Sequence, residues 1–194
     1  MSSYKNDEKT LLILDIDETL IHASERKLDS GEDFRIFDYY VYKRPYLDTF
    51  LKTVHQVFLL ALWSSASDEY VEAIAQKIIP NEIDLEFVWA RSRCTYRRNY
   101  FRDTGDFMDY KNHYHYIKPL KKLKRKGYLL DRILIVDDSP HKSKDNYGNA
   151  IYPKAFLGDS ADNELELLAQ YLQTLKDEEN VRSIEKRNWR NEIR

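Results

Sequence analysis

The chain has one cysteine, Cys94, and therefore no second thiol for an internal disulfide or a thiolate metal site. No apolar run approaches the roughly 18 residues that a membrane-spanning helix requires. The polar start of the chain lacks the apolar core of a signal peptide, and a net charge of −2 points to no class of partner. We therefore expect a soluble, cytoplasmic protein, or a nuclear one if the source is eukaryotic, with no membrane partner.

The length of 194 residues fits one domain, since domains usually run about 100–200 residues. Hydrophobic residues make up 42% of the chain and charged residues 33%, which is an ordinary balance for a folded protein. We expect a single domain over residues 1–194, with a core over about 9–175. Residues 176–194 are mostly charged and are predicted to form a solvated helix or tail. We expect a monomer.

Three short apolar runs are each followed directly by a polar residue. Such runs are typical of parallel strands that are buried on both faces. They are Leu11–Leu14 before Asp15, Val57–Trp63 before Ser64, and Ile133–Val136 before Asp137. They predict the centre of a parallel sheet.

The rest of the chain alternates between helical and extended patterns. Helices are predicted over 45–55, from Ser67 onward, over 117–126 and from about Asn163 to Leu175. Further strands are predicted over 85–90 and 151–156, a strand or hairpin insert over 35–43, and mostly loop over 91–116. Alternating strands and helices predict an α/β fold with a parallel sheet and helices on both faces.

Ligands of open parallel sheets bind at the carboxyl ends of the strands, so the polar residues found there are the best candidates for function. They are Asp15, Asp17, Ser64, Asp137 and Asp138, with Lys118 between the last two strands. Phosphoryl transfer requires a nucleophile, a cation and an acid for the leaving oxygen. This set of residues can supply all three.

The two carboxylates after the first strand are suited to the two reacting roles, nucleophile and general acid–base. Asp15 is the predicted nucleophile, because an ionised carboxylate can attack phosphorus and leave an acyl phosphate. Asp17 is the predicted acid and base, which requires its pKa to lie above the model value of about 3.9. Acid pH should therefore suit the first step.

A magnesium ion is the predicted cofactor, because Mg²⁺ prefers oxygen ligands. Asp15, the backbone carbonyl of Asp17 and Asp138 would supply three of them. Lys118 would hold the phosphate and steady Asp15. Ser64 would donate its hydroxyl to a phosphate oxygen, although a helix-capping role for the serines over 64–67 is equally consistent with the sequence.

Five motifs resemble those of known phosphatases. DIDET at 15–19 resembles the DxDxT signature of the haloacid dehalogenase superfamily. The other motifs, Lys43-Arg44-Pro45, Trp63-Ser64-Ser65-Ala66-Ser67, Tyr116-Ile117-Lys118 and Val136-Asp137-Asp138-Ser139-Pro140, resemble the FCP/SCP phosphatases, which are NLI-interacting-factor-like enzymes. The resemblance extends from about Leu11 to Leu172.

The resemblance implies a HAD-like Rossmannoid fold with a small β insert after the first strand. It also implies that Asp15 becomes phosphorylated, that Asp17 is the acid and base, and that Thr19 and Asp137 support the site. Asp138 stands where the eukaryotic enzymes usually have Asn, which keeps a metal ligand and adds charge. The implied substrate is phosphoserine or phosphothreonine in a protein.

Other functions stay open at this point. An enzyme of the same chemistry could act on a nucleotide, a nucleic-acid 3′ phosphate or a sugar phosphate, and a silent binding protein with this fold is a third reading. Arg97 and Arg98 lie in a stretch rich in arginine and tyrosine that could bind substrate or nucleic acid, or could be an ordinary solvated loop. Nucleic acid is not the favoured partner. Arg44 could anchor the turn before Pro45 or contact a substrate, and we expect anchoring.

Overall fold

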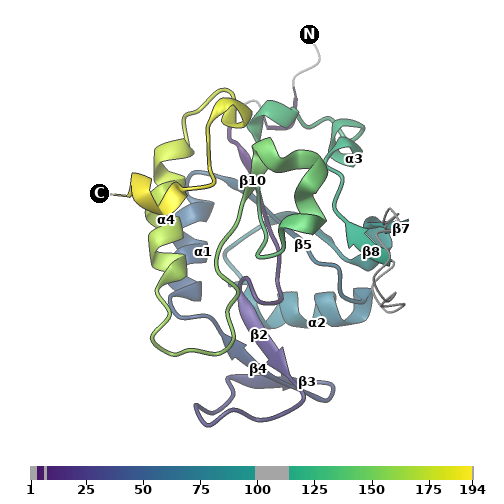
Figure 1. Ribbon diagram of the computed structural model, residues 1–194, viewed down its shortest axis with the longest axis vertical. Helices are drawn as coiled ribbons and strands as arrows, with labels where there is room; N and C mark the ends of the chain where they lie inside the picture. The colour runs from purple at the N-terminus through teal and green to yellow at the C-terminus, as the bar shows by residue number, and fades with distance from the viewer. Residues whose placement is uncertain (1–3, 7, 99–113, 194) are drawn as a thin grey trace, which may run out of the picture.

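The computed structural model describes residues 4–6, 8–98 and 114–193 and is built around a parallel sheet (Figure 1). Every neighbouring pair of strands in this sheet runs parallel. Across the sheet the strands are β10 (Ala150–Ile151), β9 (Ile133–Val136), β1 (Leu11–Leu14), β5 (Leu59–Trp63) and β6 (Leu85–Trp89). The predicted α/β fold with a central parallel sheet is confirmed.

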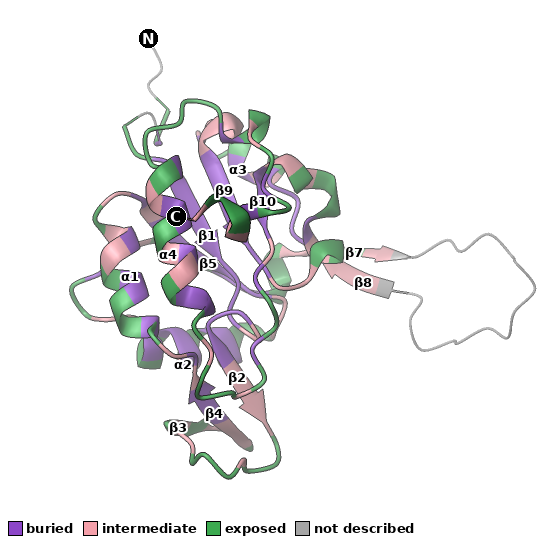
Figure 2. Ribbon diagram, turned by 60° about the vertical axis from the view of Figure 1, so that its left-hand side comes forward, coloured by how far each residue is buried: buried purple, intermediate pink, exposed green. Residues whose placement is uncertain are grey.

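The all-apolar sequence of β1 follows from its position in the middle of the sheet. Its side chains point alternately to the two faces, as in any strand. Leu12 and Leu14 belong to one hydrophobic cluster, while Leu11 and Ile13 belong to the other. Both faces must therefore be apolar, and Figure 2 shows the central strands buried between the layers that cover them.

Helices cover both faces of the sheet. Helices α1 (Leu47–His55), α2 (Asp68–Ile78) and α4 (Glu164–Leu175) contribute to the cluster on one face, and the short α3 (Lys121–Lys124) contributes to the other. Shorter 3-10 helices span Arg91–Arg93, Leu130–Arg132, Pro140–Asn149, Val181–Ser183 and Trp189–Glu192. Within the described residues, no helix is long and apolar enough to cross a membrane.

The insert predicted after the first strand is an antiparallel sheet of three strands. It consists of β2 (Ile21–Ser24), β3 (Phe34–Ile36) and β4 (Tyr39–Lys43), in the order β2-β4-β3. In Figure 1 it lies at the bottom of the molecule, below the carboxyl ends of the central strands. The insert is thus adjacent to the end of the sheet where ligands of such folds bind.

The prediction of mostly loop over 91–116 is wrong for both described ends of that stretch. Strands β7 (Thr95–Arg98) and β8 (Tyr114–Ile117) form an antiparallel ribbon. Tyr96 and Tyr116 lie directly opposite each other, with ring centroids 5.2 Å apart. Such cross-strand aromatic pairs stabilise a ribbon, and two partners that lie twenty positions apart leave no local period to detect.

Two other predicted elements are much shorter in the structure. The helix predicted over 117–126 is reduced to α3, because Ile117 belongs to β8 and Pro119 cannot donate a helical hydrogen bond. The strand predicted over 151–156 is reduced to β10. Residues 99–113 lie outside the described part of the chain.

The prediction of a solvated segment over 176–194 is wrong only in part, because most of the described residues there are exposed. The side chains of Val181 and Trp189 are buried in the cluster that includes α4. The indole nitrogen of Trp189 donates a hydrogen bond to the carbonyl of Tyr152 at 3.2 Å. A few buried apolar residues therefore pack an otherwise charged segment onto the core.

Candidate active site

The strand order brings the predicted site residues together. Strand β1 lies between β9 and β5, so Asp15 at its end lies between the residues that follow those two strands, Asp137 and Ser64. The backbone extends the ladder past the strands, since Asp15 N–H donates to the carbonyl of Val136 at 2.9 Å. All three candidate side chains are almost completely buried. The expected meeting of these strand ends is confirmed.

Lys118 links two of these carboxylates. Its ammonium lies 2.6 Å from Asp15 Oδ1 and 2.6 Å from Asp137 Oδ2, and none of its side chain is exposed. Burial alone would lower the pKa of Lys118, but the charges of Asp137 and Asp15 outweigh that effect and raise it. Lys118 is therefore a permanent cation in the site, although it comes from a segment 103 residues away from Asp15.

Asp15 is held in its ionised form. Burial by itself would raise the pKa of this carboxyl group. The ammonium groups of Lys118 and Lys142 outweigh burial and hold the pKa of Asp15 below its ordinary value. A nucleophilic carboxylate has to be ionised, and this environment keeps it so.

Asp17 has the opposite electrostatic environment. Burial raises its pKa, and the negative charge of Asp15 adds to the effect, while a hydrogen bond from Tyr70 opposes it. The hydroxyl of Tyr70 donates to Asp17 Oδ1 at 2.7 Å, and the hydroxyl of Ser64 donates to Oδ2 at 3.2 Å. Two carboxylates two residues apart thus have pKa values shifted in opposite directions.

A tight turn over residues 16–20 follows Asp15 and includes Asp17. Glu18 adopts a left-handed conformation with φ of 56°, and the N–H of Leu20 donates to the carbonyl of Ile16 at 2.8 Å. The hydroxyl of Thr19 accepts a hydrogen bond from the N–H of Asp138 at 3.2 Å. Thr19 therefore connects the first acidic motif to the last, in keeping with the supporting role predicted for it.

Three carboxylates form a group that could hold a metal ion. One oxygen each from Asp15, Asp137 and Asp138 lie within 4.8 Å of one another. An all-oxygen donor set of this kind fits Mg²⁺. The side chain of Asp17 is not part of the group, so the contribution predicted for its backbone carbonyl stays a prediction. Asp137, predicted only as a supporting residue, is a possible ligand.

Ser64 lies beside Asp17 and does not cap α2. Its hydroxyl accepts a hydrogen bond from the N–H of Ala66 at 3.0 Å, and α2 begins after Ser67, which makes no side-chain capping bond. This arrangement disfavours the helix-capping alternative for Ser64. Its predicted contact with a phosphate oxygen stays a prediction.

Two residues at the site were missed by the sequence analysis. Lys142 places its ammonium 3.1 Å from Asp15 Oδ2, and Tyr70 binds Asp17 as described. The apolar spacing of α2 makes Tyr70 look like an ordinary core residue, and Lys142 looks like one of many surface lysines. A sequence signal exists only for Lys142, which lies two residues after the last motif and four residues after Asp138.

Arg97 and Arg44 have partners within the protein. Arg97 pairs with Asp145, with a nitrogen–oxygen distance of 2.8 Å, so a substrate-binding role stays a prediction. The side chain of Arg98 lies outside the described part of the structure. Arg44 is buried, and its guanidinium binds both carboxylate oxygens of Asp162 at 2.8 and 2.7 Å. The predicted anchoring role of Arg44 is confirmed.

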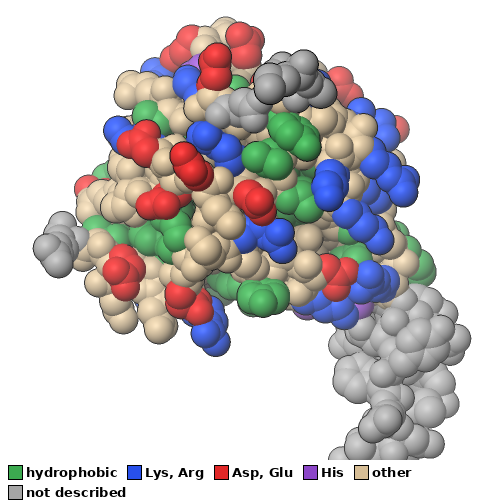
Figure 3. Space-filling view, turned by 90° about the horizontal axis from the view of Figure 1, so that it is seen from above, with side chains coloured by type: hydrophobic (Ala, Val, Ile, Leu, Met, Phe, Trp, Pro, Cys, Tyr) green, Lys and Arg blue, Asp and Glu red, His purple; other side chains and the backbone are tan. Residues whose placement is uncertain are grey.

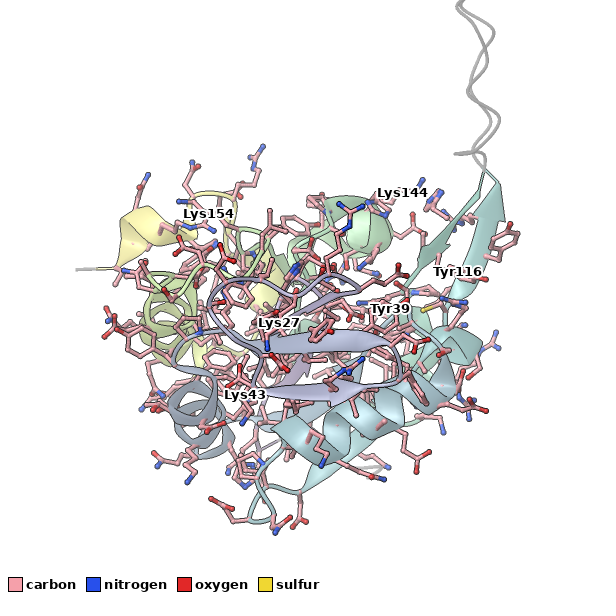
Figure 4. The ribbon with its side chains drawn as sticks, turned by 90° about the horizontal axis from the view of Figure 1, so that it is seen from below. Lys27, Tyr39, Lys43, Tyr116, Lys144 and Lys154 are labelled. Carbon is pink, nitrogen blue, oxygen red and sulfur yellow. The ribbon has the colours of Figure 1, made fainter. Side chains whose placement is uncertain are left out.

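Basic and acidic side chains meet at this end of the molecule, where Lys27 pairs with Glu32 at 2.7 Å and Lys43 pairs with Asp48 at 3.4 Å. Figure 4 views it from below, with Lys27 and Lys43 on the insert and Lys144 and Lys154 on either side. Lys27, Lys144 and Lys154 are exposed. The opposite end carries acidic and basic side chains together (Figure 3). Lys144 and Lys154 are thus the exposed cations near the buried carboxylates that could attract an anion.

Known proteins are similar to this chain in sequence and in fold. Residues 10–182 match the family described as NLI interacting factor-like phosphatase. The chain belongs to this family. The resemblance predicted from these motifs is therefore confirmed, and the family members discussed below are named as phosphatases.

Relatives in the family are similar over most of the chain. The human CTD small phosphatase-like protein is 28% identical over 183 residues, which are 91% of this chain and 59% of the human protein. The CTD nuclear envelope phosphatase 1B of Danio rerio is 29% identical over 198 residues, covering 94% of this chain and 74% of that protein. The chain thus spans about three fifths of the length of the human family member.

A solved structure in the family supports the fold. The structure of Fcp1, an essential RNA polymerase II CTD phosphatase, superposes with a TM-score of 0.65 at 18% sequence identity. The match covers 89% of this chain and 63% of that one. The predicted HAD-like fold is confirmed by this likeness.

Proposed function

We propose that this family member is a magnesium-dependent phosphatase that acts through a phosphorylated Asp15. The observation that supports the proposal best is the contrast between two neighbouring carboxyl groups. The pKa of Asp15 is lowered by two ammonium groups, and the pKa of Asp17 is raised by burial. Pairs of groups with pKa values shifted apart are typical of a nucleophile and a general acid.

In the first step, a carboxylate oxygen of Asp15 attacks the phosphorus of the substrate. The bond between phosphorus and the leaving oxygen breaks, and Asp17 gives its proton to that oxygen. Lys118 steadies the carboxylate that attacks, since its ammonium is fixed 2.6 Å from Asp15. The products of this step are a free alcohol and an acyl phosphate on Asp15.

In the second step, water attacks the phosphorus of the acyl phosphate. Asp17, now ionised, accepts a proton from the water as the bond to the Asp15 oxygen breaks. Inorganic phosphate is released and the Asp15 carboxylate is restored. Tyr70 holds Asp17 in place through both steps, since its hydroxyl donates a hydrogen bond to Asp17 Oδ1.

The residues that would hold the magnesium ion are Asp15, Asp138 and the backbone carbonyl of Asp17, with Asp137 close by. When bound, the ion offsets the negative charge that phosphate brings to a site already rich in carboxylates. The hydroxyl of Ser64 would donate to a phosphate oxygen. The assignments of Asp15, Asp137 and Asp138 rest on their carboxylate oxygens, one from each, which lie within 4.8 Å of one another.

The substrate class that we propose is phosphoserine or phosphothreonine in proteins. The names of the relatives, which are CTD phosphatases, support this choice. Lys144 and Lys154, which are exposed near the site, would favour an anionic substrate. A monomeric state, and a cytoplasmic location or a nuclear one if the source is eukaryotic, stay predictions.

A comparison of substrates tests this proposal. Purified protein would be assayed for phosphate release from phosphoserine peptides, nucleotides, oligonucleotide 3′ phosphates and sugar phosphates, with Mg²⁺ or with EDTA. We expect turnover of phosphopeptides that depends on Mg²⁺ and is abolished by Asp15→Asn, while the exposed control Asp177→Asn keeps full activity. Turnover of a small phosphate but of no phosphopeptide would overturn the substrate class. Full activity in Asp15→Asn would overturn the mechanism.

A further inference from the structure

Two lysines, not one, neutralise the carboxylates of the site. Lys118 lies between Asp15 and Asp137 on one side. The ammonium of Lys142 lies 3.1 Å from Asp15 Oδ2, 3.7 Å from Asp137 Oδ1 and 4.0 Å from Asp138 Oδ1. These three aspartates are the ones that could hold a metal ion together. Lys142 therefore interacts with the whole candidate metal-binding group.

The two lysines differ in how firmly they are held. Lys118 has no exposed side-chain surface and two contacts of 2.6 Å. The side chain of Lys142 is 15% exposed, and its contacts to the same group of carboxylates are longer. The side chain of Lys142 can thus reach solvent, which that of Lys118 cannot. Its weaker contacts with the carboxylates also make its departure less costly in free energy.

The backbone of Lys142 is anchored even though its side chain can leave. Its carbonyl accepts a hydrogen bond from the N–H of Lys118 at 2.8 Å, and its own N–H donates to the carbonyl of Ser139 at 3.0 Å. A rotation of the Lys142 side chain therefore requires no movement of the Pro140–Asn149 segment. Such rotations of partly exposed side chains are fast.

We propose that Lys142 is an internal competitor for the metal site, whose ammonium neutralises the three carboxylates in the metal-free protein and is displaced when a divalent cation binds. A divalent ion among these oxygens would lie a few ångströms from a like charge in a poorly solvated place, which is unfavourable. Displacement of the side chain removes that repulsion. Lys142 would thereby set the metal concentration at which the site fills.

This inference rests on the metal site of the proposed function, and metal binding can be measured without turnover. Isothermal titration calorimetry with Mg²⁺ would compare the wild type with Lys142→Met and with Lys144→Met. Lys144 is the matched control, because it is exposed on the same segment and makes no ion pair with the three aspartates within the described residues. We expect the Mg²⁺ dissociation constant of Lys142→Met to fall by at least about tenfold, and that of Lys144→Met to change less than about twofold.

The outcomes separate the two proposals. If the wild type binds Mg²⁺ and Lys142→Met binds it no more tightly, the competitor role is wrong. The same holds if Lys144→Met gains as much Mg²⁺ affinity as Lys142→Met. In both cases the proposed function stands. If neither the wild type nor Lys142→Met binds Mg²⁺, the metal site of the proposed function fails, and the competitor role fails with it.

A labelling experiment on the wild type avoids the risk that a variant folds poorly. Reductive methylation followed by peptide mass spectrometry would measure the reactivity of single lysines. One sample would contain Mg²⁺ at a concentration that the calorimetric titration shows to be saturating, and the other would contain EDTA at equal ionic strength. We expect Mg²⁺ to raise the labelling of Lys142 several-fold and to leave Lys144 unchanged. Equal labelling of Lys142 in both conditions would overturn displacement.

Discussion

Removing the hydroxyl of Tyr70 should shift the pH dependence of catalysis in a defined direction. This hydroxyl donates a hydrogen bond of 2.7 Å to Asp17, and the bond stabilises the ionised carboxylate. Burial already raises the pKa of Asp17, and the hydrogen bond from Tyr70 partly offsets that rise. In Tyr70→Phe the offset is lost, so the pKa of Asp17 should rise further.

The size of the shift follows from the strength of such a bond. Hydrogen bonds to charged groups contribute about 1.5–3 kcal/mol, and one pKa unit corresponds to about 1.4 kcal/mol. The expected rise in the pKa of Asp17 is therefore about one to two units. Because Asp17 has to be protonated in the first step, the alkaline limb of kcat/KM should move to higher pH by this amount.

The assay is kcat/KM for phenyl phosphate between about pH 4 and pH 9, since a poor leaving group needs the proton from Asp17. Tyr171→Phe is the matched control, because the hydroxyl of this buried tyrosine on α4 has no hydrogen-bond partner among the described residues. Its alkaline limb should coincide with that of the wild type. An alkaline limb that stays in place in Tyr70→Phe, or moves to lower pH, would refute this assignment of Asp17.

Two further predictions concern stability in urea unfolding. Lys118→Met leaves two buried carboxylates without their shared ammonium and should lower the free energy of unfolding by about 3–5 kcal/mol, while the exposed control Lys121→Met changes it by less than about 0.5 kcal/mol. If Lys118→Met lowers the free energy of unfolding by less than about 1 kcal/mol, the buried ion pairs of Lys118 do not stabilise the fold. Arg44→Met should cost about 3 kcal/mol because it removes the buried ion pair to Asp162 and the hydrogen bonds to two carbonyls, and Arg44→Lys should recover only part of this loss. Equal stability of Arg44→Met and the wild type would contradict the anchoring role.

The central sheet and its catalytic edge could be predicted because the relevant signals are local. Strands β1 and β9 are wholly apolar and buried on both faces, so each is recognisable from four consecutive residues. Asp15 and Asp137 follow these strands directly, and the parallel topology then brings them together. Composition and topology together were enough to place them at one site.

The parts that were missed depend on contacts between distant segments. The β7–β8 ribbon is stabilised by a cross-strand pair of tyrosines, and its pattern of arginines and aromatic residues has no clean period. Tyr70 reaches Asp17 across 53 positions of sequence, and Lys142 reaches Asp15 across 127. Nothing in the local sequence distinguishes Tyr70 from a core tyrosine, and the one local signal for Lys142 is its position four residues after Asp138.

The most direct test of the phosphatase mechanism is to trap the phosphorylated aspartate. The protein would be denatured during turnover of a phosphorylated substrate and treated with borohydride, which reduces an aspartyl phosphate to homoserine, and the modified peptide would be located by mass spectrometry. We predict homoserine at position 15 in the wild type and none in Asp15→Asn. Turnover without any modification of Asp15, or modification at another aspartate, would contradict the role of Asp15 as the nucleophile.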